Sequence, residues 1–151
     1  MQARYKHTNL IAADWQRLAR FYEQVFGCAR VPPERRLAGQ WLARGTGVKD
    51  AAFRGVHLRL PGHGSDGPTL EIFQYSANLP KPPAAANREG FGHIAFEVAD
   101  VEQAVAQVLA CGGRMVGQVV SHPVKGIGLL TFAYAADPEG NIIELQSWRA
   151  G

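Results

Sequence analysis

The sequence predicts an α+β fold built from two βαβββ repeats. Two stretches that begin with a histidine support this prediction: residues 7–14 read HTNLIAAD, and residues 93–100 read HIAFEVAD. Two further stretches, residues 69–75 (TLEIFQY) and 141–147 (NIIELQS), close the halves, and each places a glutamate among β-forming residues. Because a repeated sequence pattern indicates a repeated structural unit, we expect the two halves to fold alike.

The opening stretch of each half predicts a strand, and the residues after it predict a helix. Asp14 and Asp100 stand at the N-cap position, where a carboxylate accepts a hydrogen bond from an unpaired backbone N–H. Apolar residues then recur at three- and four-residue steps, from Trp15 to Phe26 and from Val101 to Leu109. Glycines end both patterns, at Gly27 and at Gly112-Gly113.

The remaining strands are expected between each helix and the closing stretch. In the first half these are residues 53–60 and one strand around residues 40–43; in the second they are 115–120 and 129–134. Residues 61–68 read as a glycine-rich turn, and the proline- and alanine-rich residues 79–90 as a linker. We therefore expect a single domain, 1–151, with a first repeat at 5–78 and a second at 91–149.

Composition limits the classes of function. The chain has 151 residues, of which 46% are hydrophobic and 19% charged, as expected for one compact globular domain. A net charge of +3 favours an anionic small molecule as partner and does not suggest nucleic acid. No apolar run is long enough to span a membrane. The residues before His7 contain no apolar segment, so we expect no signal peptide. Cys28 and Cys111 stand apart from each other, as free thiols do, so we expect a cytoplasmic protein.

Strand alternation places the two histidines and two glutamates on comparable faces. Residues two apart on a strand share a face, so His93 lies opposite the apolar Ile94 and Phe96, and Glu144 lies opposite Ile143 and Leu145. If the halves pack about a pseudo-twofold axis, His7, Glu71, His93 and Glu144 reach matching positions. Two nearby carboxylates repel, and a divalent cation compensates them. Two imidazoles and two carboxylates suit Zn, Ni, Co, Mn or Fe better than Ca.

With these residues the chain resembles the vicinal oxygen chelate superfamily, which includes glyoxalase I, bleomycin resistance proteins and extradiol dioxygenases. Several segments look most like glyoxalase I. They are His7-Thr8, Phe21-Tyr22 with Gly27, residues 90–94 (GFGHI), residues 123–126 (PVKG) and residues 137–141 (DPEGN). Residues 30–50 do not share the resemblance.

The resemblance implies a glyoxalase-like fold in which the two repeats form an open, cup-like mixed β-barrel around one divalent metal. It assigns the metal ligands to His7, Glu71, His93 and Glu144, and it suggests a homodimer. The site either lies within one chain or is shared between chains, with His7 and Glu71 from one and His93 and Glu144 from the other.

A metal of this kind polarises a substrate carbonyl and acidifies the neighbouring C–H. We expect Glu144 to be the base and Glu71 its partner acid or base, as in a lactoylglutathione lyase. Lys125, in a glycine-flanked loop, is a candidate for binding the substrate, together with Phe73 and Trp148. His57 and Arg59 either line the cup or lie on an exposed sheet edge.

Four other functions occur among relatives of this kind. A methylmalonyl-CoA epimerase-like isomerase would use the same proton removal. An extradiol dioxygenase would use two His and one Glu for iron, and the second Glu of this chain would reduce the positions open to catechol and oxygen. A non-catalytic binding or resistance protein would lack the ligand set, and fosfomycin-type transferases usually present one Glu.

Overall fold

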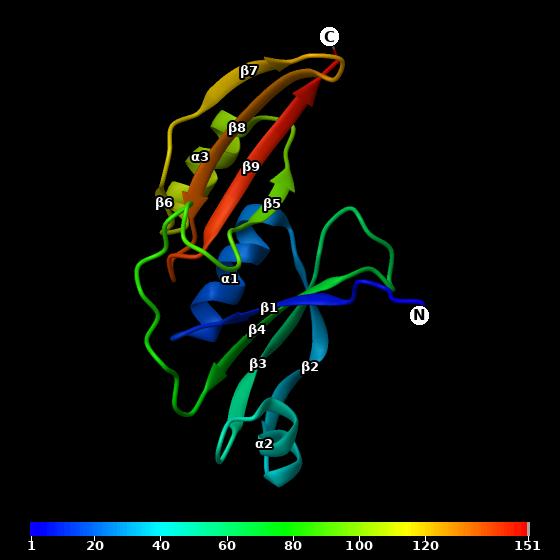
Figure 1. The fold of residues 1–151 in the computed structure, drawn as a ribbon, viewed down its shortest axis with the longest axis vertical. Helices are drawn as coiled ribbons and strands as arrows, with labels where there is room; N and C mark the ends of the chain where they lie inside the picture. Colours follow the sequence, from blue (N-terminus) through cyan, green and yellow to red (C-terminus); the bar gives the residue numbers. More distant parts are fainter. Residues whose placement is uncertain (151) are drawn as a thin grey trace. The chain divides into compact units, whose positions relative to one another are not determined.

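The computed structural model of the protein describes residues 1–150. The chain divides into two compact units, Met1–Lys81 and Pro82–Gly151, and each contains one sheet (Figure 1). The division falls inside residues 79–90, the stretch expected to link the repeats, and these residues form neither helix nor strand.

The first unit is a four-stranded mixed sheet with two helices. The strands lie in the order β1-β4-β3-β2, with β1 parallel to β4 and the other neighbours antiparallel. The strand expected at residues 53–60, the turn at 61–68 and the closing strand at 69–75 are confirmed. The elements are β1 (His7–Ile11), α1 (Trp15–Phe26), β2 (Ala29–Ala38), α2 (Gln40–Thr46), β3 (Ala52–Arg59) and β4 (Thr69–Tyr75).

Helix α1 begins and ends where the sequence predicts. Oδ1 of Asp14 accepts the backbone N–H of Arg17 at 3.0 Å, and Gly27 ends the helix with a φ of 67°. The helix covers one face of the sheet, where Leu70 and Ile72 of β4 are fully buried. Because side chains alternate along a strand, Glu71 and Phe73 point to the opposite face.

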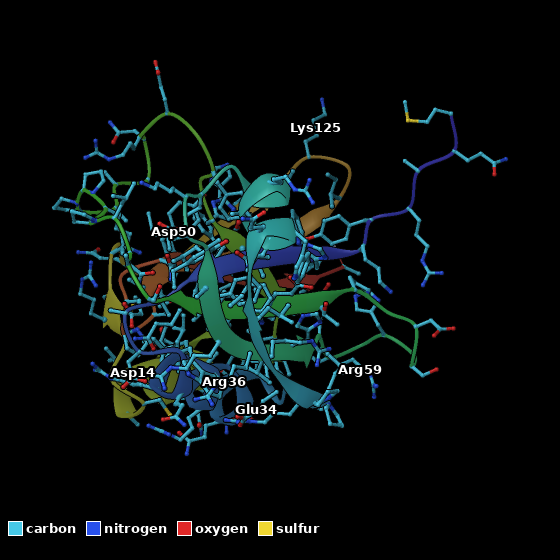
Figure 2. The ribbon with its side chains drawn as sticks, turned by 90° about the horizontal axis from the view of Figure 1, so that it is seen from below. Asp14, Glu34, Arg36, Asp50, Arg59 and Lys125 are labelled. Carbon is cyan, nitrogen blue, oxygen red and sulfur yellow. The ribbon has the colours of Figure 1, made fainter. Side chains whose placement is uncertain are left out.

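Helix α2 corrects one expectation, because residues 40–43 are helical and not a strand. Leu42 packs in a small apolar cluster with Ala51, Phe53 and Phe73, and this burial favours the helix. Gly47 ends the helix in the left-handed conformation, with a φ of 71°. Figure 2 shows α1 and α2 on opposite faces of the first sheet, so α2 covers one end of the face that carries Glu71.

The second unit is a five-stranded mixed sheet with one helix. The strands follow the order β5-β9-β8-β6, and β7 also pairs with β8. The N-cap prediction is confirmed, since Oδ1 of Asp100 accepts the N–H of Gln103 at 3.0 Å. The elements are β5 (Ile94–Glu97), α3 (Val101–Ala110), β6 (Arg114–Met115), β7 (Val120–Val124), β8 (Gly128–Ala136) and β9 (Ile142–Arg149).

The prediction of a single strand at residues 115–120 is wrong, because the structure has two separate strands there, β6 and β7. The N–H groups of Val116 and Gly117 both donate to the carbonyl oxygen of Tyr134, at 2.9 and 3.0 Å. This shared acceptor ends the regular pairing after Met115. Pairing with β8 resumes at Val120, opposite Phe132.

The predicted fold class is confirmed in its main features. The protein is a mixed α+β fold of two βαβββ-like units, and within the described residues neither sheet closes into a barrel. No helix among residues 1–150 is both long enough and apolar enough to cross a membrane.

Candidate metal centre

Three strands of the first unit place His7, His57 and Glu71 on one face of the sheet. In the β3-β4 register His57 stands directly opposite Glu71, so their side chains are nearest neighbours across the two strands. On the other side of β4, Glu71 is the partner of Asn9, and His7 lies two residues before Asn9 on the same face. A carboxylate is therefore flanked by imidazoles from both neighbouring strands.

Both imidazoles approach the same carboxylate oxygen. Nδ1 of His7 and Nε2 of His57 each lie 3.3 Å from Oε1 of Glu71. The side chain of Glu71 is only 11% exposed, whereas that of His7 is 45% exposed. The group is thus buried at the carboxylate and open to solvent at His7.

Burial governs the protonation of this group. It raises the pKa of Glu71, and the positive charges of His7 and Arg35 act against the rise. Burial also lowers the pKa of His57 to about 4, with smaller contributions from the charges of Arg35 and His7. His57 is therefore a neutral imidazole at neutral pH, which is the form that binds metals.

The second unit repeats the pairing with its own histidine and glutamate. Nε2 of His93 lies 2.9 Å from Oε2 of Glu144, whose side chain is 16% exposed. Strand β9 places Glu144 directly opposite Tyr134 of β8, and the Tyr134 ring lies 4.9 Å from the ring of His93, centroid to centroid. Tyr134 therefore restricts the position of the His93 ring.

The turn before β9 is held by a buried carboxylate. Asp137 is fully buried, and its Oδ1 accepts the N–H groups of Glu139 and Asn141, both at 2.9 Å. Its Oδ2 accepts the side-chain amide of Asn141 at 2.7 Å. These bonds fix the start of the strand that carries Glu144.

The donor separations fit ligands of a divalent metal. Imidazole nitrogens and carboxylate oxygens lie about 2.0–2.2 Å from zinc, so two neighbouring ligands are about 3 Å apart in octahedral coordination and about 3.4 Å apart in tetrahedral coordination. The observed N···O separations, 3.3 Å in the first unit and 2.9 Å in the second, are close to these values. Within residues 1–150, however, no group of three or more His, Cys, Asp or Glu is arranged to hold a metal. Each pair therefore requires further ligands.

The three residues expected to bind substrate lie in different surroundings. Phe73 is buried and stacks on Phe53, with ring centroids 4.3 Å apart, beside the ring of His57. Trp148 is 37% exposed and lines a cavity of about 790 Å³ in the second unit, whose lining includes neither His93 nor Glu144. Lys125 is exposed, and Figure 2 shows its side chain extending away from the β7–β8 loop.

The structure adds neighbours that the sequence did not assign to a site. His57 had two open interpretations, and its contact with Glu71 places it beside the first pair. The sequence also did not indicate that Tyr134 packs against His93 or that Arg35 lies near His57. The alternation of His57 and Arg59 was the available signal, but the pairing partner depends on the β3-β4 register, which the sequence alone does not fix.

The comparisons with known families and with solved structures agree on one family. The model of the Glyoxalase/Bleomycin resistance protein/Dioxygenase superfamily matches residues 4–145 of the chain. No curated protein matches the sequence.

Several solved structures share the fold. A glyoxalase family protein from Bacillus cereus has a TM-score of 0.75 at 18% identity, covering 100% of this chain and 95% of that one. A mutant of glyoxalase I from Zea mays has a TM-score of 0.65 at 24% identity, covering 98% of this chain and 45% of that one. A mutant fosfomycin resistance protein from Listeria monocytogenes, complexed with Mn(II) and a dihydroxypropylphosphonic acid, has a TM-score of 0.58 at 16% identity, covering 96% and 92%.

Proposed function

Because this chain belongs to the Glyoxalase/Bleomycin resistance protein/Dioxygenase superfamily, we propose that it is a divalent-metal-dependent lyase or isomerase of the glyoxalase I type. The observation that carries the proposal is the repeated His–Glu contact, His7 with Glu71 in the first unit and His93 with Glu144 in the second. Similar pairs at corresponding strands of two repeats are what a shared metal site requires.

In this proposal the two pairs supply four ligands to one metal, either within one chain or across a homodimer. Each pair alone offers one imidazole and one carboxylate, which is too few for a stable site. The Mn(II) complex of the Listeria relative supports a metal in this fold. The donor set suits Zn, Ni, Co, Mn or Fe, and it does not select one of them.

Glu144 is proposed as the base. Its carboxylate is mostly buried beside His93, so little water surrounds the base when it removes a proton from the substrate carbon. A divalent metal bound there supplies Lewis acidity, which polarises a substrate carbonyl and acidifies the adjacent C–H. Glu144 then takes the proton and returns it to a neighbouring carbon, with Glu71 as the partner acid or base. His93 orients Glu144, and Tyr134 limits the movement of His93.

Lys125 and Trp148 are proposed to contact the substrate, which would be an anionic small molecule. An exposed lysine on a glycine-flanked loop can approach a carboxylate or phosphate without disturbing the sheet. Phe73 is proposed to take part in substrate binding from its buried position, where its ring packs against the ring of His57.

Solvent-exchange NMR in D2O tests the proposal. Metal-loaded protein is given the hemithioacetal of methylglyoxal and glutathione, and separately methylmalonyl-CoA, and deuterium at the reacting carbon is followed. We expect conversion of the hemithioacetal, its loss with EDTA, and a decrease of about 100-fold or more in Glu144→Gln. Glu89→Gln, an exposed carboxylate outside both pairs, is the matched control and should remain active.

The other outcomes are distinct. Turnover of methylmalonyl-CoA but not of the hemithioacetal would show that the protein is an epimerase and not a glyoxalase. Turnover that survives EDTA or Glu144→Gln would contradict the proposed chemistry, and failure of metal-loaded protein on both substrates would contradict the lyase or isomerase class.

Mixing two inactive variants distinguishes the two arrangements of the site. If the ligands come from different subunits of a dimer, Glu71→Gln and Glu144→Gln chains combine to form one intact site per mixed dimer, and metal binding returns. If one chain supplies all four ligands, the mixture binds no more metal than either variant alone.

A further inference from the structure

Arg35 lies on the same face of the first sheet as His57 and Glu71. The pairing of β2 with β3 is interrupted by a bulge between Val31, opposite His57, and Arg35, opposite Gly55. Three residues of β2 (32–34) lie between these two pairs, against one residue of β3 (Val56). Paired residues share a face, and Gly55 and His57 are two apart on β3, so Arg35 lies on the face of His57. His57 is thus the diagonal neighbour of Arg35, within reach of a long side chain.

The position opposite Arg35 has to be a glycine. A Cβ atom at Gly55 would lie 2.0 Å from the carbonyl oxygen of Ile72 and 2.8 Å from the ring of Phe73. No side chain of β3 therefore stands directly across from Arg35, and His57 is the next β3 residue on this face. The charge of Arg35 acts on His57 and on Glu71, since it contributes to the pKa of both groups.

Arg35 is half-buried without a carboxylate partner. None of the ion pairs found among residues 1–150 includes Arg35, and its Nη1 donates to the carbonyl oxygen of Pro33. Arg30 on the same strand differs, because its guanidinium pairs with Glu23 and Glu34. A guanidinium carries five N–H donors, so Arg35 retains donors for a ligand.

We propose that Arg35 binds an oxyanion group of the substrate, a carboxylate or a phosphoryl group, beside the His7–Glu71 pair. The planar guanidinium matches the two oxygens of such a group in a bidentate arrangement. Partial burial of Arg35 strengthens the contact by excluding water. This inference rests on the proposed function for the reaction, and it deepens it by naming the substrate as an acid.

An NMR titration tests the site without the reaction. Acetate and methylphosphonate are titrated in separate arms into EDTA-treated protein at constant ionic strength, and the amide signals of Gly55 and His57 are followed. Without metal, neither anion can be held by a metal ligand, so a failure of the metal hypothesis does not affect the result. We expect saturable shifts at both residues in at least one arm, and the stronger arm identifies the oxyanion.

Three variants make the outcome specific. Arg35→Gln should weaken binding about tenfold or more, and Arg35→Lys, which keeps the charge but not the fork, should weaken it less. Arg36→Gln is the matched control, because Arg36 is exposed and Figure 2 places it on the α1 side of the sheet. Equal binding in wild type and Arg35→Gln, an equal loss in Arg36→Gln, or no saturable shift with either anion would overturn the inference.

Discussion

His57 faces Glu71 across β3 and β4, and its Nε2 lies 3.3 Å from the carboxylate oxygen that also contacts His7. Among residues 1–150, two imidazoles therefore pair with the carboxylate of Glu71, whereas that of Glu144 pairs with one, from His93. The two halves repeat in fold and in one His–Glu pair, but their surroundings differ. His57 and Arg35 stand beside the first pair, and Tyr134 beside the second.

The protonation of His57 gives the first prediction. Burial, Arg35 and His7 lower its pKa to about 4, so its ring should show no titration between about pH 5.5 and 8 in metal-free protein. Ring signals of the histidines, followed by NMR and assigned with His57→Gln, measure this directly. Replacing Arg35 by Gln removes a positive charge that disfavours the imidazolium, so the midpoint should rise toward the ordinary value near 6.5. A wild-type midpoint above about pH 6 would contradict the environment described for His57.

Asp137 gives a prediction for stability. Its buried carboxylate accepts three hydrogen bonds that hold the turn before β9. Asp137→Ala leaves these donors without their acceptor and should lower the free energy of unfolding by about 2–4 kcal/mol. Asp100→Ala, which removes one N-cap bond of α3, should cost only about 1 kcal/mol. Urea unfolding of both variants checks the difference, and equal effects would contradict the role given to the buried carboxylate.

The two cysteines should react at different rates. Cys28 is 4% exposed, and burial together with the nearby charge of Glu23 raises its thiol pKa to about 12. Cys111 is partly exposed. With Ellman's reagent at pH 8 we expect one thiol to react quickly and the other only after unfolding. Cys111→Ser should remove the fast phase, whereas fast reaction in that variant would show that Cys28 is accessible.

Local signals in the sequence were sufficient for the elements with a clear beginning and end. The aspartate caps, helical spacing and terminal glycines fixed α1, and the closing strands β4 and β9 followed from their β-forming residues. Strand alternation, a local property, predicted that each histidine and each glutamate lies on the face opposite the apolar residues of its strand. The His–Glu contacts themselves depend on the pairing of β1 with β4 and of β5 with β9, and the role of these four residues as metal ligands stays a prediction.

Features that depend on tertiary packing could not be predicted in the same way. Residues 40–43 form a helix because Leu42 packs against Phe53 and Phe73, which are distant in sequence. The positions of His57 and Arg35 depend on strand register and on a bulge, and neither has a sequence signal of its own.

Metal content tests the central claim most directly. Untagged wild-type protein, Glu71→Gln and Glu144→Gln are analysed by plasma mass spectrometry, before and after incubation with Zn, Ni, Co, Mn and ferrous iron. The proposed site predicts about one equivalent of divalent metal per chain in the wild type, and a clear loss in both variants, because each removes a charged ligand. Wild-type protein that holds no metal after these incubations, or variants that hold as much as the wild type, would contradict it.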